Sequence, residues 1–159
     1  MSQAPEPPIV HIAVVEDDEA DLYLLRIILQ RAQVTCVIDH LTDGDEAVAF
    51  LLQQGRHQHA PRPDLIVLDL NLPKLRGDEV LRKIREERPD LQQVPVVVLT
   101  TSDLLHDRQT MAALGVTRYL TKSSDSAALA QIGRTIKDVL LQTKGGENDG
   151  DHHADRDDH

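Results

Sequence analysis

The sequence predicts an α/β fold, namely a doubly wound five-stranded parallel sheet with helices on both faces. Short apolar runs of strand length alternate along the chain with longer segments of helical period, which is typical of successive βα units. Residues that end helices or open strands stand between these segments. Pro89 and Pro95 separate the third helical segment from the fourth apolar run, and Gly115 follows the fourth helical segment.

Five strands and five helices follow from this pattern. The strands are expected at Ile9 to Val15, Val34 to Leu41, Leu65 to Leu68, Val94 to Leu99 and Val116 to Leu120. The helices are expected near Asp21 to Ala32, Asp45 to Gln53, Glu79 to Glu87, Asp107 to Leu114 and Ser126 to Gln142. Residues 9–142 then form one domain, between a disordered lead at residues 1–8 and a disordered acidic tail at residues 143–159.

Charge and composition exclude several classes of partner. The 159 residues carry a formal net charge of −10, and the tail holds six acidic residues against Lys144 and Arg156, which leaves −6 for the rest. A surface of this sign repels nucleic-acid phosphates and anionic lipid, so we expect neither nucleic acid nor a membrane as partner. The single cysteine, Cys36, and the absence of a signal peptide or long apolar run predict a cytoplasmic protein.

Polar residues of a few chemical types follow the predicted strands. Glu16, Asp17 and Asp18 come after the first strand, Asp69 after the third, Thr100 and Thr101 after the fourth, and Lys122 after the fifth. Open parallel sheets place their functional loops beyond the carboxyl ends of the strands. We therefore expect these side chains to meet in one pocket.

Together these residue types indicate phosphoryl transfer to a carboxylate, with Asp69 as the nucleophile. Carboxylates sharing one pocket raise each other's pKa unless a cation is present, and Mg²⁺ suits such a site. A lysine and a threonine hydroxyl supply positive charge and a donor to phosphoryl oxygens. Taken singly, each residue also has an ordinary interpretation: Asp17, Asp18 or Glu19 as a helix N-cap, Asp69 as a turn residue and Lys122 as a surface charge.

Four motifs carry a resemblance to a known family. They are the acidic stretch Val14 to Asp18, the segment Val67 to Pro73 with Gly77 eight residues beyond Asp69, the strand Pro95 to Thr100, and the segment Tyr119 to Lys122. In this order they resemble the acidic pair, the phosphorylation loop, the switch threonine, and the switch aromatic and lysine of response regulator receiver domains. The resemblance covers about residues 9–142.

The resemblance implies a flavodoxin-like strand order 2-1-3-4-5 and a role for each site residue. It implies that Asp17 and Asp69 ligate Mg²⁺ directly, Asn71 through its backbone carbonyl, and Glu16 through water. Asp69 would accept a phosphoryl group from a sensor histidine kinase, Thr100 and Lys122 would hold that group, and Tyr119 would turn inward on activation. Such a chain is a phosphoacceptor that also dephosphorylates itself, and not an enzyme acting on other substrates.

A narrower resemblance is to the regulators paired with bacterial phytochromes. It comes from the long connection Gln53 to Pro63 and from the segments Leu-Asn-Leu-Pro-Lys and Leu-Thr-Thr-Ser. It implies a light-sensing histidine kinase as partner, and a homodimer. We expect the dimer to use the fourth helix, the fifth strand and the last helix, where Leu141 falls outside the inward apolar stripe.

Two positions depart from the family pattern. Ser123 stands where the family has a proline after its lysine, so the path of that loop is open. Thr101 is bulkier than the residue usual beside the switch threonine, which favours a long-lived phosphoryl group.

The sequence argues against two other functions and leaves a third open. An aspartyl phosphatase needs a second acid where Asn71 stands, and a flavin binder needs a hydroxyl- and glycine-rich loop where the chain has Glu16 to Asp18. A receiver-like scaffold that binds partners without being phosphorylated remains the alternative function.

Overall fold

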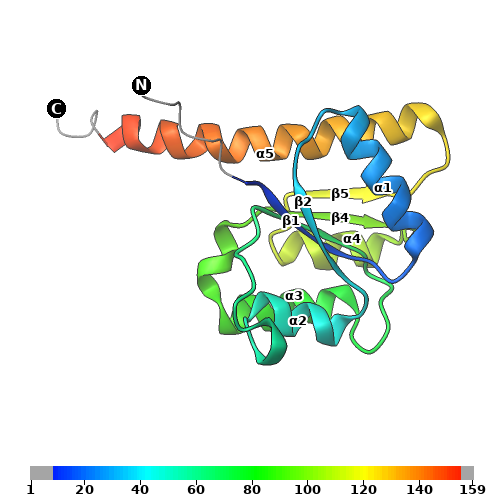
Figure 1. Ribbon diagram of the computed structural model, residues 1–159, viewed down its shortest axis with the longest axis horizontal. Coiled ribbons are helices and arrows are strands. Elements are labelled where there is room, and N and C mark those ends of the chain that lie inside the picture. Colours follow the sequence, from blue (N-terminus) through cyan, green and yellow to red (C-terminus); the bar gives the residue numbers. More distant parts are fainter. Residues whose placement is uncertain (1–8, 155–159) are drawn as a thin grey trace, which may run out of the picture.

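The computed structural model describes residues 9–154, and the side chains of residues 9–143. Its five strands form one parallel sheet in the order β2-β1-β3-β4-β5, as predicted (Figure 1). The strands are β1 (His11–Val15), β2 (Val37–Leu41), β3 (Leu65–Leu68), β4 (Val96–Thr100) and β5 (Arg118–Thr121). The predicted lead at residues 1–8 lies outside the described residues.

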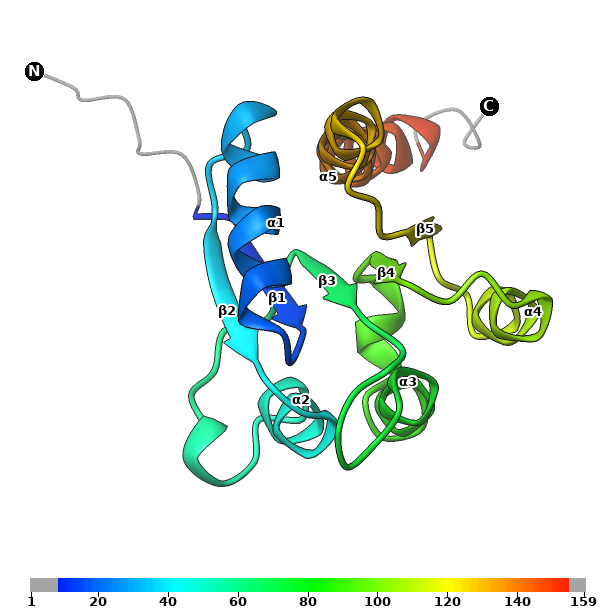
Figure 2. The same cartoon turned by 90° about the vertical axis from the view of Figure 1, so that its right-hand side faces the viewer.

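Helices cover both faces of the sheet, which confirms the doubly wound fold. They are α1 (Glu19–Arg31), α2 (Gly44–Leu51), α3 (Gly77–Glu87), α4 (Leu105–Ala113) and α5 (Ser126–Ala154), with short 3₁₀ turns at Gly55–His57 and Pro89–Gln93. Figure 2 shows α1 and α5 on one face, and α2 and α3 on the other. Met111 of α4 is buried in the same apolar cluster as α2 and α3.

Alternate residues of the central strands point into two separate cores. In β1, Ile12 and Val14 are buried against α1 and α5, whereas Ala13 and Val15 are buried on the α2 and α3 face. A strand with apolar neighbours on both faces does not alternate between polar and apolar residues. These strands therefore appear in the sequence as continuous apolar runs. The two cores hold the sheet rigid, so the residues at the strand ends have fixed positions.

Close backbone packing joins α5 to α1. A Cβ atom added at Gly133 would lie 2.9 Å from Cγ2 of Ile28 and 3.1 Å from Cβ of Ala32. Lys137 Nζ also donates to the carbonyl of Ala32 at the end of α1 (3.1 Å). These contacts fix α5, and therefore the loop that joins it to β5.

Two element boundaries differ from the sequence prediction by more than two residues. Strand β2 starts at Val37 rather than Val34, because Gln33 has a positive φ of 62° and the Val34 amide donates to the Leu29 carbonyl that ends α1. Helix α5 continues to Ala154, past the predicted end at Gln142 and into the predicted tail (Figure 1). Adding residues to a formed helix fixes few dihedral angles per new hydrogen bond, so extension needs no further apolar stripe. Residues 155–159 lie outside the described range.

Across residues 9–154, none of the helices combines the length and the hydropathy that a membrane span needs.

Candidate phosphoacceptor and metal site

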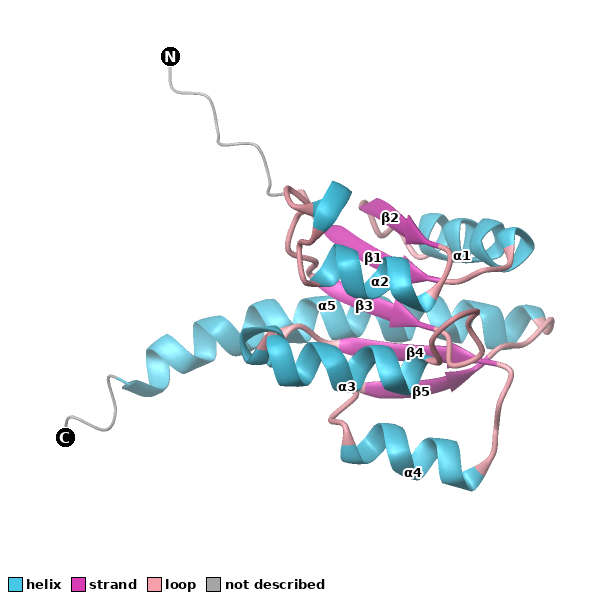
Figure 3. Ribbon diagram, turned by 90° about the horizontal axis from the view of Figure 1, so that it is seen from below, coloured by secondary structure: helices cyan, strands magenta, loops and turns pink. Residues whose placement is uncertain are grey.

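The carboxyl ends of the strands meet at one edge of the sheet (Figure 3). Two ladder hydrogen bonds reach just beyond the strands and align their last residues there: Asp69 N donates to the Val15 carbonyl (3.1 Å), and Glu16 N donates to the Leu41 carbonyl (3.0 Å). The acidic residues that follow β1 and β3 are therefore neighbours, as the sequence predicted.

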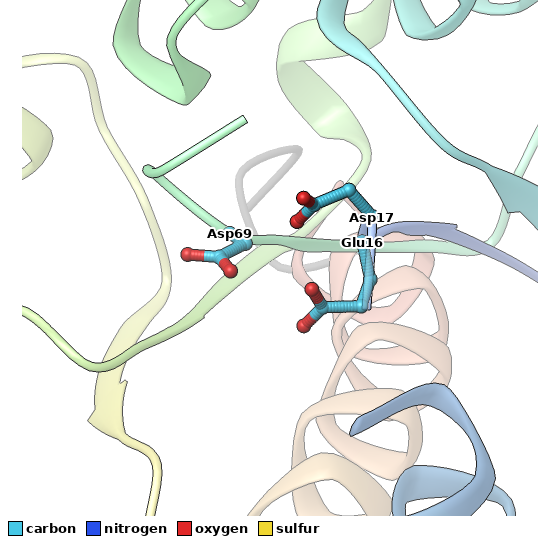
Figure 4. A group of neighbouring side chains, drawn as sticks. All are labelled: Glu16, Asp17 and Asp69. Atoms are coloured by element: carbon cyan, nitrogen blue, oxygen red, sulfur yellow. The ribbon is translucent and has the colours of Figure 1, made fainter. Parts of the chain in front are cut away.

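Glu16, Asp17 and Asp69 form a compact acidic cluster (Figure 4). One carboxylate oxygen from each residue lies within 4.8 Å of the others. Glu16 and Asp69 are buried, with 6% and 5% of their surfaces exposed, whereas Asp17 is exposed. Oxygen ligands at this spacing, open to water on one side, fit a hard divalent cation such as Mg²⁺.

Asp18 takes the ordinary role that the sequence left open for it. Its side chain accepts from Ala20 N (2.8 Å) and Asp21 N (3.1 Å), which makes it the N-cap of α1. Asp17 is not the cap and belongs to the acidic cluster. The two neighbouring acids thus have different functions.

Lys122 is the cation that balances the acidic cluster. Its Nζ lies 2.6 Å from Glu16 Oε1, 2.8 Å from Asp69 Oδ2 and 2.8 Å from Asp21 Oδ2, and 14% of its side chain is exposed. Burial alone lowers the pKa of Lys122, but the hydrogen bonds to the three carboxylates outweigh burial and raise it. Lys122 is therefore a fixed positive charge beside Asp69, and not a solvated surface residue.

Glu16 is the buried carboxylate closest to Lys122, and burial shifts its pKa upward rather than downward. Hydrogen bonds from Lys122 and from the Asp18 amide oppose the rise. The cluster therefore favours binding of a further cation.

Asp21 is a site residue that the sequence analysis did not identify. It was assigned only to the start of the first helix, yet its side chain pairs with Lys122 across a separation of 101 residues. Its place in the first turn of the helix that follows β1 was an available signal, because that turn starts at the carboxyl edge of the sheet, where functional groups gather.

Asp69 opens a loop, residues 69–77, which we call the phosphorylation loop. Asn71 N donates to Asp69 Oδ1 (3.2 Å), and Gly77 N donates to the Leu70 carbonyl (3.0 Å). A Cβ atom at Gly77 would collide with the backbone carbonyl of Asp69. The loop thus folds back so closely that only glycine fits at its end. The proposed use of the Asn71 carbonyl as a metal ligand stays a prediction.

Gly77→Ala is expected to lower phosphorylation of Asp69 at least tenfold, because the new methyl group must displace the Asp69 backbone from the acidic cluster. Phosphorylation rates with acetyl phosphate would measure this loss. Gly55→Ala is the matched control, since Gly55 has a positive φ of 58° but no atom within 4 Å of an added Cβ. Equal rates for both variants would show that the close approach at Gly77 is unimportant.

The two predicted switch residues contact Ser102. Thr100 is fully buried, and its Oγ1 accepts from Ser102 N (3.4 Å). Tyr119 Oη donates to the Ser102 carbonyl (2.8 Å), and the Arg108 guanidinium lies 4.5 Å from the centre of the Tyr119 ring. Tyr119 is half-buried, and burial raises its pKa.

The loop after Lys122, where the sequence lacks the proline, is tied to the end of β4. The peptide bond between Lys122 and Ser123 is trans. Lys122 N donates to the Thr100 carbonyl (2.7 Å), which ties the loop to the end of β4. The lysine therefore reaches the site from a backbone that β4 positions.

Comparison with known proteins agrees with this geometry. The response regulator receiver domain family matches residues 12–134. Response regulator Rcp1 from Synechocystis sp. is 46% identical over 147 residues, which cover 90% of this chain and 96% of Rcp1. Among solved structures, the phosphorylated cyanobacterial phytochrome response regulator RcpA has a TM-score of 0.77 at 42% identity, covering 86% of this chain and 96% of RcpA.

The Mn²⁺-bound form of Rcp1 has a TM-score of 0.73 at 44% identity, covering 80% of this chain and 91% of that structure. The family model spans most of the described domain, and it includes Glu16, Asp17, Asp69, Thr100 and Lys122. This chain therefore belongs to the response regulator receiver domain family.

Proposed function

We propose that this receiver accepts a phosphoryl group on Asp69 from a sensor histidine kinase, with Mg²⁺ held by Glu16, Asp17, Asp69 and the Asn71 carbonyl. The observation that carries the proposal is the pairing of Asp69 with Lys122 (2.8 Å) inside the acidic cluster. When bound, Mg²⁺ would supply positive charge to phosphoryl oxygens. The Mn²⁺-bound structure of Rcp1 supports a divalent metal site.

The residues of this chain have separate tasks in the transfer. An Asp69 carboxylate oxygen forms a bond to phosphorus while the bond from phosphorus to the donor's histidine nitrogen breaks, and the imidazole regains a proton. Lys122 pairs with the phosphoryl oxygens, and the Thr100 hydroxyl donates to them. The same site returns the group to water, so the chain is an acceptor and not an enzyme acting on other substrates.

Acetyl phosphate provides a direct test of this proposal. With Mg²⁺ present, the purified protein should gain one phosphoryl group by intact-mass measurement, and with a chelator it should gain none. Absence of the group under both conditions would favour the alternative function, a receiver-like scaffold that binds partners without being phosphorylated.

We further propose a light-sensing phytochrome kinase as the phosphoryl donor. The similarity to the phytochrome response regulator RcpA, and the 32% identity to the bacteriophytochrome response regulator RtBRR at a TM-score of 0.67, support this choice. A cytoplasmic location belongs to the same proposal, and the free thiol of Cys36 fits a reducing compartment. The acidic net charge argues against nucleic acid or membrane as a partner.

The proposed output is a homodimer through α4, β5 and α5. Three exposed apolar side chains on these helices support it, namely Leu104 and Leu105 at the start of α4 and Leu141 on α5, which are 63%, 69% and 58% exposed. The dimer should tighten when Asp69 carries beryllofluoride, which resembles a phosphoryl group. Light scattering behind a sizing column would measure this change, and a monomer mass in both states at tens of micromolar protein would contradict the proposal.

Asp17→Asn is expected to weaken Mg²⁺ binding and Asp69 phosphorylation together, each by roughly tenfold to a hundredfold, because it removes one of three clustered carboxylates. Calorimetric titration with Mg²⁺ and acetyl phosphate labelling would measure the two effects. Asp18→Asn is the control, since asparagine also caps helices and Asp18 is not in the cluster. Unchanged metal affinity in Asp17→Asn would remove Asp17 from the metal site.

A further inference from the structure

His40, in β2, contacts the backbone of the turn that carries the acidic cluster. Its Nε2 lies 2.7 Å from the carbonyl oxygen of Glu16. A carbonyl oxygen can only accept a hydrogen bond, so Nε2 carries the hydrogen and donates it. The side chain of His40 is therefore bonded to the peptide group that joins Glu16 to Asp17.

This hydrogen bond stands where the ladder between β1 and β2 ends. The Glu16 amide still donates to the last carbonyl of β2 (3.0 Å), as in a regular parallel ladder. The next ladder bond would run from the Asp43 amide to the Glu16 carbonyl. The chain has left the ladder before that point, because the Thr42 amide donates to Glu46 Oε2 in α2 (3.1 Å). His40 thus supplies a donor in place of the backbone.

The middle residue of the turn depends on this contact. The turn between β1 and α1 consists of Glu16, Asp17 and Asp18. Asp18 is held as the N-cap of α1, and its amide donates to Glu16 Oε2 (3.1 Å). Within residues 9–143, Asp17 makes no hydrogen bond or ion pair of its own. Its position is therefore set by the two peptide groups that flank it, and His40 holds the first of them.

The orientation of this peptide group decides where two carboxylates point. Figure 4 shows Glu16 and Asp17 turned toward Asp69 from consecutive positions. Consecutive side chains of a regular strand point to opposite faces, so this arrangement requires a particular rotation of the peptide group between them. A hydrogen bond to the carbonyl of that peptide group fixes the rotation.

We propose that His40 is a positioning residue of the metal site, and that its hydrogen bond to the Glu16 carbonyl keeps the carboxylates of Glu16 and Asp17 directed toward Asp69. This inference rests on the proposed function, since it concerns the residues that would hold Mg²⁺. Without the hydrogen bond, the turn must be ordered when the cation binds, and the cost of ordering weakens binding.

His40→Leu is expected to weaken Mg²⁺ binding about three- to tenfold in a calorimetric titration, which is the effect of losing one hydrogen bond. Phosphorylation by acetyl phosphate should need correspondingly more Mg²⁺, and it should reach the parent rate once Mg²⁺ is saturating.

Two polar variants test whether the donor itself is responsible. His40→Gln should bind Mg²⁺ within about twofold of the parent, because the glutamine amide nitrogen can take the place of Nε2. The asparagine side chain is shorter, so in His40→Asn the amide cannot reach the carbonyl, and this variant should bind Mg²⁺ as weakly as His40→Leu.

His11→Leu is the matched control. His11 is also a partly buried strand histidine, and its Nδ1 pairs with Asp39 Oδ2 (3.0 Å), but it stands at the start of β1, at the opposite edge of the sheet. His11→Leu should lower the stability to urea and leave the Mg²⁺ affinity unchanged. This control separates a loss of stability from a loss of metal binding.

Parent affinity for Mg²⁺ in folded His40→Leu would overturn the inference, whatever the loss of stability. If circular dichroism shows that this variant is unfolded, the two polar variants decide, and equal Mg²⁺ affinities of His40→Asn and His40→Gln would overturn it. Failure of the parent itself to bind Mg²⁺ would overturn the proposed metal site together with this inference.

Discussion

Asp69→Asn is expected to abolish phosphorylation, with at least a hundredfold loss of labelling by acetyl phosphate in the presence of Mg²⁺. The amide has nearly the shape of the carboxylate and still accepts a hydrogen bond from Lys122, so the fold should survive. It is neutral, however, and a poor nucleophile toward phosphorus. It also removes one of the three clustered charges that attract the metal. Intact-mass measurement over time would give the loss directly.

Asp64→Asn is the control for this experiment. Asp64 stands just before β3, at the opposite end of the same strand, where its carboxylate accepts from His11 N (2.8 Å). Its loss should leave labelling unchanged. Equal labelling of Asp69→Asn and the parent would place the phosphoryl group on another residue.

Lys122→Met should have the largest effect on stability. The substitution leaves the buried carboxylates of Glu16 and Asp69 facing each other without their cation. Removing one partner from such a group lowers the free energy of unfolding by about 3 kcal/mol. Loss of the lysine charge also makes the cluster more attractive to Mg²⁺, so at one Mg²⁺ concentration the variant should gain more stability than the parent; a protein at a hundred times its own Kd gains about 2.7 kcal/mol.

Urea unfolding with and without Mg²⁺ would measure both parts of this expectation. Lys137→Met provides the comparison, because Lys137 is also half-buried but donates to the Ala32 carbonyl, far from the acidic cluster along α5. The stability of Lys137→Met should depend on Mg²⁺ no more strongly than the stability of the parent does. The expectation fails if Lys122→Met and the parent gain equally from Mg²⁺.

The candidate site is mostly predictable because its residues stand at strand ends. Parallel strands carry their last residues to one edge, so the sequence positions of Asp17, Asp69 and Lys122 already imply that they meet. Whether Asp17 caps the first helix or belongs to the acidic cluster was not predictable. The two roles differ only in how the chain turns after β1, and the structure assigns the cap to Asp18.

By itself, the sequence determined the class of fold, the order of strands and helices along the chain, and the residue types at the carboxyl edge. Each of these depends on local periodicity and on chain order. Only the tertiary structure decided which distant side chains pair: Asp21 with Lys122, and Arg76 with Asp107. It also decided that α5 extends to Ala154. A contact between residues far apart in sequence depends on the direction of each side chain and the path of each loop, and hydrophobic periodicity specifies neither.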